Sequence, residues 1–285
     1  MLYKNYDDAG LDAQYRLRAR HPDYQDYFDK WEQESERVRQ KFPCRLDIAY
    51  GDKPGEKLDV FPAPKPGAPV QFFIHGGYWQ FLDKKGHSFI AEPFVSAGCA
   101  VVAINYTLAP GATMDEIVRQ NRAALAWTYR NARSFNGDPS RIYLSGHSAG
   151  GHLVAMMMAT HWETEWGLPA DIVKGGCAIS GLFDLEPIRL CYVNDALKMD
   201  EEVARRNSPI HHLPKGSRPL IIAVGAQETD EFIRQSADFA AILKDYGYPA
   251  EYLLLPNHHH FTILLELGKA HSPLTQAIFK QMAIG

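Results

Sequence analysis

Short apolar runs alternate with helix-like stretches along most of this chain, and this alternation constrains the fold more than any other feature. The apolar runs lie at residues 70–74, 99–105, 142–145, 175–179, 220–224 and 251–255. Helical patterns separate several of them, at residues 114–133, 152–159 and 230–246. Buried strands that alternate with helices build a mostly parallel sheet covered on both faces. The sequence therefore predicts an α/β fold.

The chain opens with a different pattern. Residues 12–41 are polar and carry aromatic residues at loosely helical spacing, which predicts helices that pack over the main domain. Two short strands are expected next, at residues 46–50 and 57–61, as a hairpin-like opening of the sheet. We expect an N-terminal helical extension at residues 1–44 and one α/β domain at residues 45–285.

The composition narrows the class of protein. Hydrophobic residues make up 46% of the chain and charged residues 22%, as in soluble globular proteins. The net charge of -4, with scattered Lys and Arg, offers no basic stripe, so we expect a small-molecule substrate and no nucleic-acid partner. No run of about 18 apolar residues predicts a membrane span, and residues 1–10 lack an apolar signal core. A cytoplasmic protein with four reduced, widely spaced cysteines is expected.

The strongest chemical signal is the string Gly146-His147-Ser148-Ala149-Gly150. It stands between the apolar run at residues 142–145 and the apolar helical pattern at residues 152–159. A serine on a sharp strand-to-helix turn is exposed to a base and to oxyanion donors, and glycines beside it leave room for the turn. Ser148 is therefore the candidate nucleophile, and the expected fold is that of the α/β-hydrolases.

The glycine pair in His75-Gly76-Gly77-Tyr78-Trp79 follows the apolar run at residues 70–74. In α/β-hydrolases this position supplies backbone N–H groups to the oxyanion hole. The candidate donors are Ala149 and Gly77, with a further N–H from Gly76 or Tyr78. Tyr78 and Trp79 are candidates for contact with an aromatic substrate, and the alternative is that both pack under the loop.

The catalytic base is expected after the last apolar run, at residues 251–255, because the histidine comes last in this fold. Three adjacent histidines stand there, His258, His259 and His260, and chemistry alone does not rank them. A metal site is the alternative for such a triplet. It is disfavoured because adjacent side chains point in different directions and do not converge on one ion.

The acid that orients the histidine should follow the preceding apolar run, at residues 220–224, which makes Glu228 and Asp230 the candidates. Asp184 also follows an apolar run, but one strand earlier, and is expected to be structural. Residues 182–217 are expected to leave the sheet and lie near the site.

Four strings together carry a family resemblance. The chain resembles the kynurenine formamidase (arylformamidase) branch of the hormone-sensitive-lipase-like α/β-hydrolases, and the resemblance spans nearly the whole sequence. The strings that carry it are His75-Gly76-Gly77-Tyr78-Trp79, Asn105-Tyr106-Thr107-Leu108-Ala109-Pro110, Gly146-His147-Ser148-Ala149-Gly150-Gly151-His152 and Glu231-Phe232-Ile233-Arg234-Gln235-Ser236.

The resemblance ranks the remaining candidates. The family acid lies four residues before the phenylalanine of the last string, which selects Glu228 over Asp230. The family histidine directly precedes a phenylalanine, which selects His260, before Phe261, over its two neighbours. A glutamate stands where many members have aspartate, and His259 replaces the usual polar neighbour.

The same resemblance implies a cofactor-free serine hydrolase that cleaves N-formylkynurenine or a related aryl formamide in tryptophan breakdown. A general carboxylesterase acting on short-chain or aryl esters is the alternative, because it uses the same triad. A binding protein that lost the chemistry is disfavoured because serine, acid and histidine are all present. The metal-binding string of the unrelated metal-dependent formamidases is absent from the sequence. The oligomeric state stays open, with a homodimer as one arrangement.

Overall fold

The computed structural model describes every residue except Lys215, Ser217 and Gly285. The first two belong to the expected excursion at residues 182–217 and the third ends the expected domain at residues 45–285, so these positions lie outside the described residues. The strands are β1 (Arg45–Ala49), β2 (Lys57–Phe61), β3 (Ala68–Ile74), β4 (Ala100–Ile104), β5 (Gly137–His147), β6 (Val173–Ile179), β7 (Leu220–Gly225) and β8 (Ala250–Leu255).

Within the described residues, the strands form one eight-stranded sheet in the order β1-β2-β4-β3-β5-β6-β7-β8. Strand β2 is antiparallel to both β1 and β4, as expected for a hairpin-like opening. All pairs from β4 to β8 are parallel. The predicted α/β-hydrolase architecture, with a mostly parallel sheet, is confirmed.

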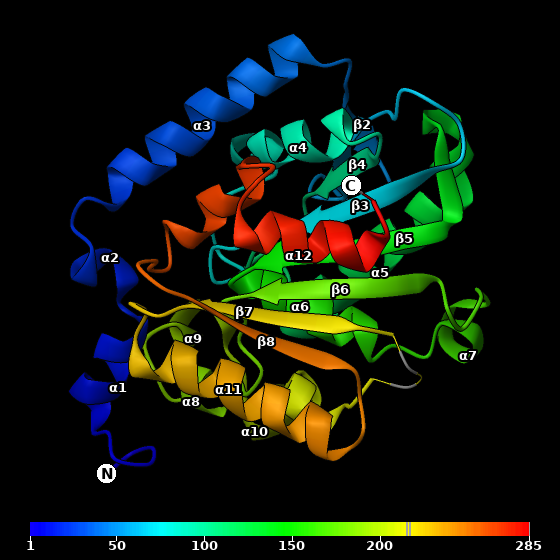
Figure 1. Cartoon of the computed structure of the whole chain (residues 1–285). Helices are drawn as coiled ribbons and strands as arrows, with labels where there is room; N and C mark the ends of the chain where they lie inside the picture. Colours follow the sequence, from blue (N-terminus) through cyan, green and yellow to red (C-terminus); the bar gives the residue numbers. More distant parts are fainter. Residues whose placement is uncertain (215, 217, 285) are drawn as a thin grey trace.

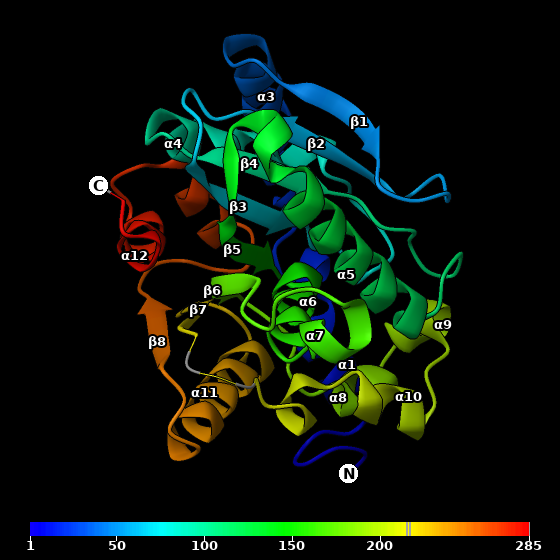
Figure 2. The ribbon, with the colours of Figure 1, turned by 90° about the vertical axis from the view of Figure 1, so that its right-hand side faces the viewer.

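Helices cover both faces of the sheet. Figure 2 shows α4 and α12 on one side of it and α5 and α6 on the other. The α-helices are α1 (Asp8–Tyr15), α2 (Leu17–Arg20), α3 (Tyr24–Lys41), α4 (Ala91–Ser96), α5 (Met114–Asn131), α6 (Ala149–Met158), α7 (Trp162–Trp166), α8 (Glu186–Arg189), α9 (Asn194–Leu197), α10 (Glu201–Arg206), α11 (Asp230–Asp245) and α12 (Pro273–Met282). Short 3-10 turns are η1 (Lys85–Ile90), η2 (Ala132–Phe135), η3 (Pro209–His211) and η4 (Ile263–Gly268). Within the part of the chain that the structure describes, no helix combines the length and apolar character needed to cross a membrane.

Strand β5 begins earlier than its apolar pattern suggests. The apolar run that predicts this strand begins at residue 142, whereas β5 begins at Gly137. Asn136 takes a left-handed conformation, with φ of 66°, and reverses the chain in a single residue after η2. Gly137 then pairs with Ala68 ahead of a register shift, so the strand gains a polar first half.

The N-terminal helices lie along the edge of the sheet at which the parallel strands end (Figure 1). Their apolar residues are buried in the same hydrophobic cluster as the sheet, with Leu11, Tyr15 and Val38 fully shielded from solvent. The hydroxyl group of Ser35, on α3, accepts a hydrogen bond from the Phe89 N–H, on η1. These contacts place α1, α2 and α3 next to the loops that follow β3, β5 and β8.

Candidate active site

Ser148 occupies the turn between β5 and α6, as the sequence predicts. Its backbone angles, φ 57° and ψ -118°, are strained for a residue with a side chain. The Ser148 N–H donates to the Ile179 carbonyl at 2.8 Å, which fixes the turn to β6. A Cβ atom on Gly146 would lie 2.3 Å from the Gly150 carbonyl oxygen, so the turn requires glycine there. This arrangement is the strand-turn-helix context in which a serine serves as a nucleophile.

Glu228 and His260 form a buried pair beside this turn. The Nδ1 atom of His260 lies 2.6 Å from Glu228 Oε2. The Glu228 side chain is fully buried and that of His260 is 4% exposed. Because a carboxylate only accepts, Nδ1 carries the proton and Nε2 is left as the acceptor that a general base needs. Both residues follow the carboxyl ends of strands, Glu228 after β7 and His260 after β8.

The other candidates for base and acid lie elsewhere. His259 directs Nε2 to the Tyr27 hydroxyl at 3.4 Å, and burial lowers its pKa to about 4. The Nε2 atom of His258 lies 3.9 Å from a Glu266 carboxylate oxygen. Asp230 is exposed at the first position of α11. Of the candidates, the structure thus brings only Glu228 and His260 together.

Ser180 is a further residue of this pair that the sequence did not single out. Its hydroxyl donates to Glu228 Oε1 at 2.5 Å, and the Gly225 N–H donates to the same oxygen at 3.0 Å. Both carboxylate oxygens are therefore held, one by the histidine and one by these two donors. Asp184, which the sequence predicted to be structural, accepts from the Tyr3 hydroxyl at 2.9 Å instead.

The glycine pair after β3 lies against the serine turn. A Cβ atom on Gly76 would be 3.0 Å from the Cβ atom of Ser148, so only glycine permits this approach. Gly77 has φ of +102° and lines the same cavity as Ser148 and His260. Ala149 is the first residue of α6, and its N–H has no intrahelical acceptor and lies at the positive end of the helix. These positions suit the predicted oxyanion donors.

The two aromatic residues after the glycine pair, Tyr78 and Trp79, take different positions relative to the cavity. Tyr78 lines the cavity and donates its hydroxyl to the Tyr15 carbonyl at 2.9 Å. Trp79 is fully buried with its ring edge-on to His152, 5.0 Å between ring centroids, and is not among the lining residues. Its placement fits the alternative of packing under the loop, because the ring is fully buried and does not line the cavity.

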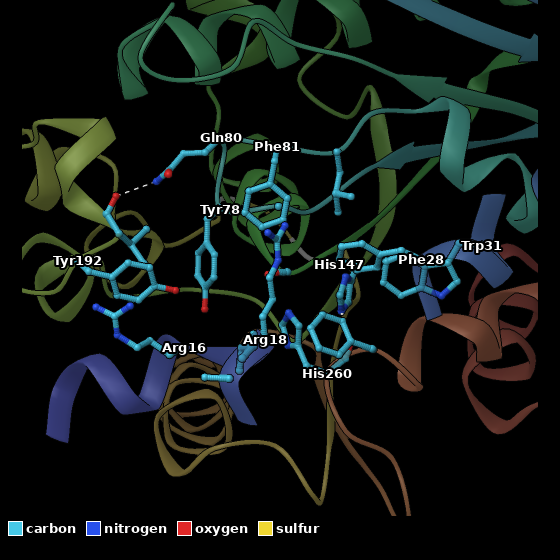
Figure 3. A pocket seen from close by; sticks show the side chains of 17 residues that line it. Arg16, Arg18, Phe28, Trp31, Tyr78, Gln80, Phe81, His147, Tyr192 and His260 are labelled. Atoms are coloured by element: carbon cyan, nitrogen blue, oxygen red, sulfur yellow. Dashed lines mark hydrogen bonds between the residues drawn. The ribbon is translucent and has the colours of Figure 1, made fainter. Parts of the chain in front are cut away.

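A cavity of about 330 Å³ opens above Ser148 and His260. Small-molecule sites typically have this size and an aromatic lining. Residues of the N-terminal helices, of the glycine loop after β3 and of the segment after β6 line this cavity. Figure 3 shows many of these side chains. The aromatic members are Phe28, Trp31, Tyr78, Phe81, Tyr192 and Phe261.

His147 joins the nucleophile turn to the histidine loop. Its Nε2 atom lies 2.9 Å from the His260 carbonyl oxygen and donates to it. Burial, reinforced by the neighbouring His260 ring, lowers the pKa of His147 well below its usual value. A neutral His147 thus links the backbone of His260, the candidate base, to the strand that precedes Ser148, the candidate nucleophile.

Comparison with known proteins agrees with this geometry. The family profile BD-FAE matches residues 58–243. A kynurenine formamidase of Danio rerio is 37% identical over 255 residues, covering 87% of this chain and 85% of its own. The chain belongs to the kynurenine formamidase family. A second member, from Salmo salar, is 38% identical over 256 residues with the same coverage of both chains.

A solved structure shares the fold over nearly the whole chain. A crystal structure of a candidate thioesterase from Silicibacter sp. superposes with a TM-score of 0.83 at 28% identity. The superposition covers 94% of this chain and 98% of that chain. As a kynurenine formamidase family member of the α/β-hydrolase type, the protein is a hydrolase.

Proposed function

We propose that this hydrolase removes the formyl group from an aryl formamide of the N-formylkynurenine type, with Ser148, His260 and Glu228 as its triad. The observation that carries the proposal is that His260, paired with the buried Glu228, lines the same cavity as a serine held on a strained turn. The relatives at 37–38% identity are kynurenine formamidases, which supports the choice of a formamide.

The first half of the reaction forms an acyl-enzyme. His260 Nε2 takes the proton of the Ser148 hydroxyl as its oxygen bonds to the formyl carbon. The oxygen of the formyl group becomes an oxyanion, which accepts from the N–H groups of Ala149 and Gly77. The carbon–nitrogen bond then breaks, His260 returns the proton to the leaving aryl amine, and a formyl ester remains on Ser148.

The second half releases formate. Water gives a proton to His260 and bonds to the formyl carbon, and the resulting oxyanion again rests on the Ala149 and Gly77 amides. The ester bond to Ser148 breaks, and the serine oxygen recovers its proton from His260. Throughout, Glu228 holds the imidazole tautomer and stabilises the imidazolium without itself taking a proton.

The cavity supports an aromatic leaving group. Its lining is rich in aromatic rings, and flat rings favour offset or edge-on contacts with one another. The formyl side needs room only for a hydrogen atom, and Gly76 brings the backbone close to Ser148. The aromatic lining of the cavity therefore fits the leaving group of an aryl formamide.

The test compares kcat/KM for N-formylkynurenine with kcat/KM for p-nitrophenyl acetate, using release of the aryl amine and of nitrophenol. We expect the formamide to be the better substrate. A preference for the ester by several orders of magnitude would instead identify a carboxylesterase. The Ser148→Ala variant should lose both activities while remaining folded, and turnover retained in that variant would exclude the serine mechanism.

A further inference from the structure

The charged residues that line the cavity share one sign. In a chain of net charge -4, the lining includes Arg16 and Arg18, and none of the described lining residues is Asp or Glu. A cavity lined by one sign of charge attracts ligands of the opposite sign. The charge of the lining thus favours a substrate that bears an anionic group.

The two arginines differ in their partners. Arg16 pairs with the Asp12 carboxylate at 2.8 Å and lies over the Tyr192 ring, 4.2 Å from its centroid. Among the described residues, no carboxylate lies within ion-pair distance of the Arg18 guanidinium. Arg18 is therefore the cation of the lining whose charge is not matched within this part of the chain.

Aromatic rings hold the Arg18 side chain in place. Its guanidinium carbon lies 4.1 Å from the Phe81 ring centroid, 5.2 Å from that of Tyr24 and 5.6 Å from that of Phe28. Figure 3 shows the side chain extending from α2 toward Phe81. Stacking engages the flat face of a guanidinium and leaves its N–H edge available for a carboxylate. The rings thus orient a donor fork without using its donors.

The backbone that carries Arg18 is attached to the cavity wall. The Tyr15 carbonyl, at the end of α1, accepts from the hydroxyls of Tyr78 and Tyr192, each at 2.9 Å. Tyr78 directly follows Gly77 of the glycine loop. These hydrogen bonds fix the position of helix α2 relative to the proposed oxyanion donors. They therefore also fix the position of Arg18 relative to the carbonyl group that reacts.

We propose that Arg18 binds a carboxylate carried by the leaving group, so that the preferred substrates are aryl formamides or aryl esters whose leaving group bears a carboxylate. The inference rests on the proposed function for the type of bond that the enzyme cleaves. The charge expected on the leaving group is inferred from the cavity lining alone. Arg18 is a specificity residue: it touches the substrate away from the bond that breaks and acts mainly through binding.

The experiment uses two matched substrate pairs that differ in one charge. The formamide pair is N-formylkynurenine and its primary carboxamide, and the ester pair is 3-acetoxybenzoate and 3-acetoxybenzamide. The variants are Arg18→Met, which keeps an unbranched stem against Phe81, and Arg18→Lys, which keeps the charge but not the fork. Arg20→Gln removes a charge from the same helix at a position outside the cavity lining.

The measured quantity is the ratio of kcat/KM for the carboxylate member of each pair to that for its carboxamide member. In Arg18→Met this ratio should fall about 10- to 100-fold, mainly through KM, as expected for loss of a charge-assisted hydrogen bond. Arg18→Lys should lie between this variant and the natural protein, and Arg20→Gln should keep the natural ratio. Added salt should lower the ratio in the natural protein more than in Arg18→Met.

Two results would overturn the inference: an unchanged ratio in Arg18→Met, or an equal loss on both members, which would mark Arg18 as a packing residue. The proposed function fails separately. If the natural protein cleaves the esters and leaves both formamides intact, the formamide assignment is wrong, and the ester pair still decides the role of Arg18.

Discussion

Glu228 holds His260 through one carboxylate oxygen, 2.6 Å from the ring Nδ1 atom, at a site from which solvent is nearly absent. A hydrogen bond in such surroundings is stronger than in water, and leaving either partner unpaired is correspondingly costly. The pair joins the loops after β7 and β8, which the parallel sheet places side by side. Contacts between neighbouring strands thereby fix the tautomer of His260, the candidate base.

Replacing Glu228 by glutamine should lower kcat about 10³- to 10⁴-fold, because the amide favours the wrong histidine tautomer and does not stabilise the imidazolium. Steady-state kinetics on the preferred substrate give the measurement. Asp230→Asn is the matched control, since Asp230 is the other acid that the sequence offered and is exposed. A comparable loss in the control would reassign the acid.

Ser180→Ala should lower kcat about 10- to 100-fold and leave KM unchanged. The variant removes a hydrogen bond to a buried carboxylate, and bonds to charged groups contribute about 1.5–3 kcal/mol. KM should not change because Ser180 is absent from the cavity lining. Ser272→Ala removes another buried hydroxyl, the cap of α12, and should reduce stability while keeping kcat. If Ser180→Ala retains kcat within twofold, the carboxylate does not need this donor.

The sequence predicted the parts of the site that depend on local structure and chain order. The serine turn is readable because a strand, two glycines and a helix adjoin Ser148 within a few residues. Glu228 and His260 follow successive strands, so the order of strands placed them at one edge of the sheet. Family resemblance was still needed to choose among the three adjacent histidines, because their chemistry is the same.

Contacts between segments that are distant in the sequence could not be predicted from the sequence. Ser180 reaches Glu228 across two neighbouring strands, and its only signal was a polar residue directly after a buried strand. Arg18 enters the cavity because tertiary contacts attach the N-terminal helices to the glycine loop. The side on which Trp79 packs depends on the left-handed conformations of Tyr78 and Trp79, and no periodic pattern records such angles.

Gly77→Ala should lower kcat about 100-fold or more, as removal of one oxyanion donor does. An added Cβ atom would lie 2.0 Å from the Phe81 carbonyl oxygen, so the loop must move away from Ser148. Gly67→Ala is the control, because Gly67 also has a positive φ, +77°, and its Cβ would meet no atom within 4 Å. The control should show backbone strain as a lower melting temperature with kcat retained. Full activity in Gly77→Ala would remove this loop from the oxyanion hole.

Two fully buried histidines make the stability of the fold sensitive to acid. Burial lowers the pKa of His75 to about 3 and that of His152 to about 4. An unfolded histidine titrates near pH 6.5, so below that pH the unfolded chain binds protons that the folded chain excludes. The free energy of unfolding contributed by these residues is therefore complete above pH 6.5 and declines from there toward pH 4.

Between pH 7.5 and 5.5 each of these two histidines should reduce the free energy of unfolding by about 1 kcal/mol. Urea titrations at the two pH values measure the loss. His152→Gln removes one titrating group while keeping a donor for the Asn207 carbonyl, so its loss should be smaller by about 1 kcal/mol even though the variant is less stable at pH 7.5. His271→Gln, at an exposed position, should keep the natural loss. An equal loss in the natural protein and in His152→Gln would show that other groups cause the acid sensitivity, because the buried ring is the only titrating group that this variant removes.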